Sequence, residues 1–239
     1  MDGHDFDATR STPIDPPASS DAPDDTPLDP RSVSAVLDAL LRSPARLIGP
    51  LRDSPAAASR VLAIALVGLL ATGVSMASWS GGLQLAMVPM KLAILAIVTA
   101  LVCMPSLHVL SALSGGRQSL GETFGALSMG VALTAVIAVA LAPIAWVLSA
   151  ATDSLALTGT LYLFVFVIAA GLGLGLVRRA MASSAGHVVR GLGAWSFLFA
   201  LVALQLATTL RPLVGPFDGL SLHERTFFLA HLAQGLGAS

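Results

Sequence analysis

Five stretches of this chain contain no charged residue over 20 to 30 positions each. They are 61–90, 92–116, 123–152, 154–177 and 191–210. One helix needs about 20 apolar residues to cross the hydrocarbon core of a bilayer, so no stretch is long enough for two helices and a turn. We therefore expect one membrane-spanning helix in each, within a five-span membrane domain over 55–216. The expected helices lie near 58–79, 88–111, 122–148, 157–177 and 192–212.

The composition agrees with a membrane location. Of the 239 residues, 55% are hydrophobic and 11% are charged, whereas a soluble domain carries about 25% charged residues. We therefore expect an all-α fold, a polytopic membrane helix bundle. The single cysteine, Cys103, excludes an internal disulfide and a metal site built from several cysteines. No cofactor, metal ion or nucleic-acid partner is expected.

The first 30 residues differ from the rest of the chain. Segment 1–30 is rich in Asp, Pro and Ser and has almost no apolar side chain to bury, so it predicts a disordered acidic tail. The favoured interpretation is a solvated tail, and the alternative is an acidic bait for a basic partner.

Segment 31–54 predicts an amphipathic helix ahead of the first span. Its apolar residues recur at helical spacing and share one face: Val33, Val36, Leu37, Leu40 and Leu41. Arg42, Arg46 and Arg52 lie beside this face, and a short basic amphipathic helix in such a place typically lies in the headgroup plane. At the other end of the chain, 217–239 is too polar and too short for a span and predicts a surface helix.

The basic residues predict how the chain is threaded. Nine arginines fall on one side of the expected spans: Arg31, Arg42, Arg46, Arg52, Arg60, Arg117, Arg178, Arg179 and Arg190. Lys91, Arg211 and Arg225 fall on the other side. The richer side is expected to face the cytoplasm, with the amino terminus inside and the carboxyl terminus outside. Aromatic anchors agree, with Trp79, Trp146 and Tyr162 at expected outer ends and Trp195 at an inner end.

The stretch 101–117, LVCMPSLHVLSALSGGR, forms the inner half of the second expected span. Pro105 cannot donate to the carbonyl of Leu101, so we expect a kink, with Ser106 or a neighbouring helix bonding the freed oxygen. His108 has two interpretations: a proton relay or ligand, or an interfacial, hydrogen-bonded histidine. The second is favoured because no acidic residue lies in the same span.

The end of this stretch predicts a helix boundary. Gly115 and Gly116 are expected to end the second span. Ser119 and Glu122 have the spacing of a capping box that opens the third.

An intramembrane serine protease would need a serine and a histidine side by side. Ser75 follows Gly73 in a weak Gly-x-Ser pattern and lies about 22 Å above Arg60 along a helix, near the outer leaflet. His108 is expected near the inner leaflet, so we exclude this chemistry on geometry.

The glycines of the fourth expected span predict packing. The run Gly171-Leu-Gly-Leu-Gly175 lies inside the span and lacks the lysine of a phosphate-binding loop. Gly171 and Gly175 have the spacing of a small-xxx-small face, which allows close helix contact.

Arg211 and Asp218 are candidates for a contact after the fifth span. Arg211 falls at the lipid boundary, and Pro212 with Gly215-Pro216 is expected to turn the chain back along the membrane surface. The favoured interpretation is a structural clamp to Asp218 or an arginine that reaches the interface. The alternative is a docking point for an external partner.

Three phrases, LLRSPARLIGPLR, MPSLHVLSALSGGR and LRPLVG, resemble bacterial members of the Yip-type integral membrane proteins, over roughly residues 36 to 216. The resemblance implies five spans with a cytoplasmic amino-terminal tail, and it brings no catalytic residues. The eukaryotic members are linked to vesicle trafficking and small-GTPase binding, which a bacterial relative need not inherit. The single lysine beside twelve arginines is typical of a GC-rich bacterial genome, so we expect the bacterial cytoplasmic (inner) membrane.

Two functions are compatible with this pattern. The favoured one is a non-enzymatic membrane scaffold, or a subunit of a larger inner-membrane assembly, that contacts the lipid bilayer and other membrane proteins or itself. The alternative is a transporter or permease component. Transporters usually carry polar groups at mid-depth and paired broken helices in repeated halves, whereas five spans do not divide into two halves.

Overall fold

The computed structural model describes residues 32–53, 55–78, 82, 84–116, 118–152, 155–185 and 191–209, and these parts are helical with no strand. Their helices, in chain order, are α1 (Val33–Arg42), α2 (Ala45–Asp53), α3 (Pro55–Ala77), α4 (Gln84–Leu113), α5 (Leu120–Ala150), α6 (Leu155–Ala185) and α7 (Leu192–Thr209). The predicted all-α class is therefore confirmed for the described parts. The tail over 1–30, the surface helix over 217–239, Arg211 and Asp218 lie outside them.

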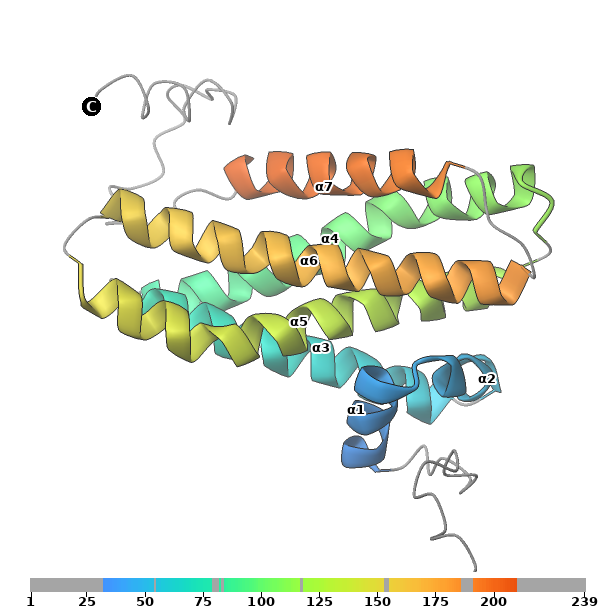
Figure 1. Cartoon of the computed structure of the whole chain (residues 1–239), viewed down its shortest axis with the longest axis horizontal. Coiled ribbons are helices and arrows are strands. Elements are labelled where there is room, and N and C mark those ends of the chain that lie inside the picture. Colours follow the sequence, from blue (N-terminus) through green and yellow to red (C-terminus); the bar gives the residue numbers. More distant parts are fainter. Residues whose placement is uncertain are drawn as a thin grey trace, which may run out of the picture.

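The five helices from α3 to α7 run along the long axis of the molecule (Figure 1). α5 lies at the centre and packs most extensively against α6 and α3, and α4 packs against α3 and α5. α7 packs chiefly against α4. Side chains on α5 that face these neighbours are mostly alanine, glycine and serine, which allows the helices to approach closely.

Among the described residues, four helices are long and apolar enough to cross a membrane, namely α3, α4, α5 and α6, and α7 is a shorter apolar helix. The chain is thus a multi-pass membrane protein. α4 has 30 residues and α5 and α6 have 31 each, a length of about 45 Å at 1.5 Å per residue. Because the hydrocarbon core is about 30 Å thick, these three helices extend beyond it.

Helix α6 is longer than the sequence predicts. The expected fourth span ends near residue 177, where the uncharged stretch ends, but α6 continues to Ala185. Arg178 and Arg179 are exposed while Ala180 and Met181 are buried. Charge ends the membrane-buried part of a helix but does not end the helix, because exposed arginines are good helix formers.

The boundary between α4 and α5 forms as predicted. Gly115, just after α4, has a φ of 86°, a left-handed conformation that glycine adopts without strain. The Ser119 side chain accepts from the Glu122 N–H at 3.2 Å, and a Glu122 carboxylate oxygen accepts from the Ser119 N–H at 2.9 Å. The capping box at the start of α5 is therefore confirmed.

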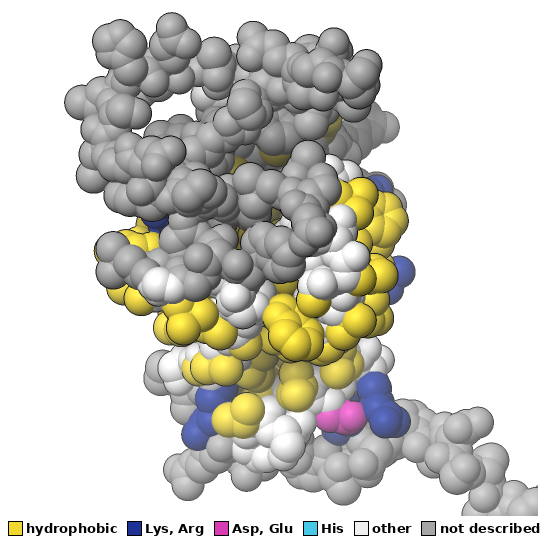
Figure 2. Space-filling model, turned by 90° about the vertical axis from the view of Figure 1, so that its left-hand side faces the viewer, with side chains coloured by type: hydrophobic (Ala, Val, Ile, Leu, Met, Phe, Trp, Pro, Cys, Tyr) yellow, Lys and Arg dark blue, Asp and Glu magenta, His cyan; other side chains and the backbone are white. Residues whose placement is uncertain are grey.

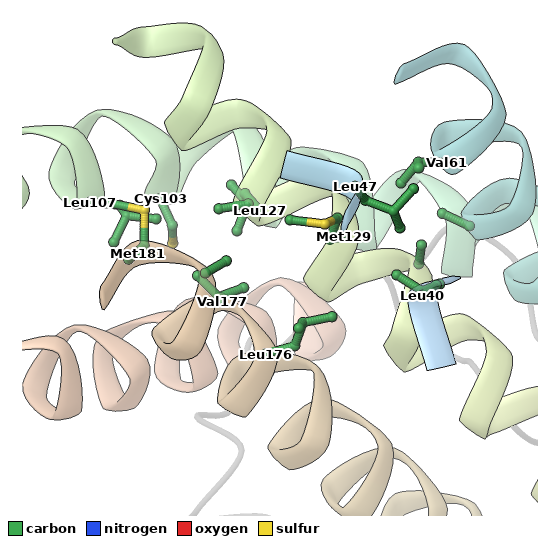
Figure 3. Close-up of a cluster of buried hydrophobic side chains, with 14 of the residues drawn as sticks. Leu40, Leu47, Val61, Cys103, Leu107, Leu127, Met129, Leu176, Val177 and Met181 are labelled. Carbon is green, nitrogen blue, oxygen red and sulfur yellow. The ribbon is translucent and has the colours of Figure 1, made fainter. Parts of the chain in front are cut away.

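The amphipathic segment packs onto the bundle. α1 lies across the direction of the long helices, beside α3 (Figure 1). Val36, Leu40 and Leu47 are buried in the main core, and Figure 3 shows Leu47 next to Val61 and Met129. The apolar face of segment 31–54 is thus shared with the bundle. Its position at the headgroups stays a prediction.

Candidate functional site

Pro105 lies within a continuous α4, on its exposed side. The Ser106 hydroxyl donates to the Cys103 carbonyl at 2.7 Å. Of the two partners expected for the Leu101 carbonyl, Ser106 therefore bonds a different carbonyl, and a neighbouring helix stays a prediction. A Ser side chain reaches a carbonyl three or four residues back on its own helix, and here it reaches the nearer one. Pro105 is exposed, whereas the next residue, Ser106, is half-buried and bonds the backbone of its own helix.

Trp195 of α7 bonds the same two residues of α4, Cys103 and Ser106. Its Nε1–H points at both the Ser106 Oγ, at 3.1 Å, and the Cys103 carbonyl, at 3.3 Å. Only 4% of Trp195 is exposed, and its ring centroid lies 5.4 Å from that of Phe199 in a tilted arrangement. The prediction of an interfacial anchor was wrong for this residue, because the ring turns into the bundle and bonds a neighbouring helix. We call the Trp195, Ser106 and Cys103 contact the indole clasp.

His108 makes a hydrogen bond between α4 and α5. Its Nδ1 lies 3.3 Å from the hydroxyl oxygen of Thr123, which is fully buried. The Thr123 hydroxyl itself donates to the Ser119 carbonyl at 3.2 Å, so its oxygen is left to accept from His108 Nδ1–H. This contact supports the interpretation of His108 as a hydrogen-bonded residue, and its position at the membrane interface stays a prediction.

Gln118 carries a contact that sequence reasoning missed. The Ser111 hydroxyl donates to Gln118 Oε1, and Gln118 Nε2 donates to the Met181 carbonyl of α6 at 2.8 Å. Ser111 and Gln118 are both buried. The connection between α4 and α5 is thereby tied to α6. The only signal in the sequence was an uncharged polar residue directly after Gly-Gly-Arg.

A further polar contact involves Tyr162, which belongs to a different core cluster. The hydroxyls of Ser75 and Tyr162 lie 3.2 Å apart, and Ser75 Oγ lies 3.4 Å from the Ala142 carbonyl. Tyr162 is buried, so its prediction as an interfacial anchor was wrong. Trp146, by contrast, is exposed and donates to Ser78 Oγ at 2.9 Å. Ser75 pairs with Tyr162 and His108 with Thr123, which agrees with the exclusion of a serine–histidine pair.

The glycine that packs in α6 is Gly173. A Cβ at Gly173 would lie 2.5 Å from the Gly130 carbonyl oxygen of α5 and would collide with Thr134 Oγ1, whereas one at Gly171 or Gly175 would meet no atom within 4 Å. Close packing at Gly171 and Gly175 therefore has no partner within the described helices. Gly173 lies on the other side of α6 because two residues along a helix turn the side chain by about 200°.

Besides Tyr162 and Trp195, the buried polar residues among those described carry a hydroxyl or, in Gln118, a side-chain amide. They are Thr72, Thr99, Ser111, Gln118, Thr123, Ser128, Ser149 and Thr158. The described residues contain no group of three metal-ligating side chains. A small pocket between α2, α5 and α6 is lined mainly by apolar residues and glycines, with Glu122 at its edge. The hydrogen bonds described above join neighbouring helices.

No protein-family model, curated protein or solved structure matches this chain. The resemblance to Yip-type membrane proteins therefore stays a prediction.

Proposed function

We propose that this protein is a non-enzymatic scaffold, or a subunit of a larger assembly, in the bacterial cytoplasmic membrane. In this proposal α3 to α7 are five spans, and the amino terminus is cytoplasmic. α7 has 18 residues, about 27 Å in length, which nearly matches the hydrocarbon core. The Yip-type resemblance is kept as the proposed family.

The observation that carries the proposal is a glycine face of α6 that no other described helix covers. Phe164 and Val167 are exposed on the side of α6 that also carries Gly171 and Gly175. Spacings of three and four residues place these four positions on one face. Membrane helices associate through such faces because glycine lets two backbones approach closely. A second copy of this chain, or another membrane protein, fits this face.

The buried hydroxyls support a packed scaffold over the transporter alternative. Thr72, Thr99 and Ser149 are buried and donate to the carbonyl four residues earlier on their own helices, at 2.7 to 2.8 Å. The half-buried Thr134 does so at 2.9 Å. A hydroxyl that donates to its own helix backbone does not use that hydrogen to bind a solute. Transporters usually present polar groups and unwound helices to a central site.

The threading is tested by reporter fusions. A reporter after Arg179, in α6, is expected on the cytoplasmic side, and one after Ser239 on the opposite side, because one span separates the two positions. An alkaline phosphatase and green fluorescent protein pair at each position measures sidedness. The same sidedness for both fusions would contradict five spans.

Self-association through α6 is tested by replacing Gly171 and Gly175 with leucine together. Two bulky side chains separate the backbones, so the dissociation constant of a dimer should rise by about tenfold. Resonance energy transfer between donor- and acceptor-labelled copies in vesicles measures it. Thermal melting should stay unchanged, because a Cβ at either position meets no atom of the described residues within 4 Å.

Gly159→Leu is the matched control for this experiment. Gly159 also lies on α6, and a Cβ added there would meet no atom within 4 Å, but it is three turns from Gly171. Association lost equally in the control, or kept in the double variant, would contradict the α6 interface.

A further inference from the structure

Helix α1 has two apolar faces, and the bundle covers one of them. Val36, Ala39 and Leu40 are buried. A second set, Val33, Leu37 and Leu41, repeats every four residues and therefore forms a stripe along the helix. Val33 is 54% exposed and Leu41 is 53% exposed. We call Val33, Leu37 and Leu41 the outer stripe.

The third side of α1 is polar. Ser34, Asp38 and Arg42 are exposed, and they too follow one another at intervals of four residues. Around the helix, α1 therefore presents first the buried face, then the outer stripe, then the polar side. A helix in the plane of a membrane interface, beside a protein, meets protein, acyl chains and water in this order.

The helix on which α1 packs is apolar enough to cross a membrane. α1 packs on α3, whose exposed large apolar side chains begin at Leu62, two residues after Arg60, and continue with Leu66 and Val67. α1 thus packs on a membrane-spanning helix that carries an arginine and, two residues later, its first exposed leucine. Exposed leucine and valine side chains at this level are stabilised by contact with acyl chains.

Among the side chains that the structure describes at this end of the bundle, positive charges outnumber negative ones. Arginines with described side chains are Arg42, Arg46, Arg60, Arg178 and Arg179. The carboxylates described there are Asp38 and Glu122. In Figure 2, cationic side chains and a carboxylate gather at the lower edge, below the apolar side chains of the long helices. This balance favours anionic headgroups over neutral ones.

Arg42 is held only loosely. Its Nε lies 2.9 Å from Asp38 Oδ1, with 81% of the arginine side chain and 64% of the aspartate side chain exposed. Exposed pairs one helical turn apart contribute little to stability, so Arg42 can exchange its carboxylate partner for a phosphate. Arg46 is also exposed and lies four residues further along the chain, in α2.

We propose that α1 and the start of α2 form a binding surface for an anionic phospholipid. The outer stripe contacts the acyl chains, and Arg42 and Arg46 bind the headgroup phosphate. This inference uses the membrane location of the bundle and does not depend on self-association through α6.

The test places a bimane fluorophore on a cysteine at position 41, in a full-length Cys103→Ala background reconstituted in vesicles. Brominated phosphatidylcholine quenches the fluorophore where acyl chains touch it. Brominated phosphatidylglycerol, at the same mole fraction, reports an anionic preference. We expect phosphatidylglycerol to quench the Leu41→Cys label about two- to fivefold more efficiently, since each interfacial arginine strengthens binding by up to about fivefold.

Three comparisons make the test decisive. A label at Ser34→Cys, on the polar side of α1, should be quenched much less by either lipid. Arg42→Gln with Arg46→Gln should bring the ratio between the two lipids close to one, and 1 M salt should do the same with the arginines intact. Equal quenching at positions 34 and 41, or an unchanged lipid ratio in both the double variant and high salt, would overturn the proposal. Protection of position 41 from both lipids, with cross-linking between copies, would also overturn it and assign the stripe to a protein contact.

Discussion

Replacement of Trp195 with alanine is expected to lower the free energy of unfolding by about 3 to 5 kcal/mol, the range for truncating a buried Trp or Phe. α7 packs chiefly against α4, so loss of the indole clasp removes the largest side chain from the contact that holds α7. Equilibrium unfolding in mixed micelles measures the change. Faster cleavage of the chain before α7 by an added protease should accompany it.

Trp195→Phe is the control for the indole clasp. Phenylalanine keeps a ring next to Phe199 but cannot donate to Ser106 or Cys103, so the expected loss is about 1 kcal/mol. A loss of the same size in both variants would show that burial of the ring adds little. A loss below about 1 kcal/mol in Trp195→Ala would contradict the role of Trp195 in holding α7.

Replacement of Gly173 with valine is expected to be the most damaging single change in α6. The new Cβ would meet the Gly130 carbonyl oxygen at 2.5 Å and Thr134 Oγ1, and a backbone oxygen cannot move aside without shifting α5. Overpacking of this kind costs about 1 to 3 kcal/mol and occasionally more. We expect the upper part of that range, because α5 and α6 form the most extensive helix contact of the bundle.

The matched control for Gly173 is the same substitution at Gly171. Valine has the same helix propensity and apolar character at both positions, and at Gly171 its Cβ meets no atom within 4 Å. Melting temperatures of the two variants, measured in the same detergent, should therefore separate clearly. Equal destabilisation would mean that the loss of glycine itself, and not the contact with α5, causes the effect.

The helical membrane class followed from local information. Long uncharged stretches determine that the chain must satisfy its backbone hydrogen bonds inside a bilayer, and a helix does so within its own segment. The start of α5 was equally local, since Ser119 and Glu122 bond each other across three residues. Membrane-spanning helices and helix caps depend on residues that are close in the sequence, so the sequence alone predicts them.

Tertiary contacts decided which residues of a given type do the packing. Gly171, Gly173 and Gly175 are indistinguishable in the sequence, and only the approach of Gly130 selects Gly173. Trp195 and Tyr162 could equally have pointed to the interface, but partners on α4 and α3 draw both rings inward.

Sequence patterns alone were enough to establish that this chain forms apolar helices, roughly where they lie, and that α1 is amphipathic. Packing between helices settled how α1 divides its apolar residues between the bundle and an exposed stripe, because that division depends on how α3 and α5 approach it. Hydropathy describes how strongly a side chain favours leaving water. It does not distinguish a side chain that enters lipid from one that enters a protein core. Whether a side chain faces lipid or the core depends on how the helices fit against one another, and these helices come into contact only when the chain folds.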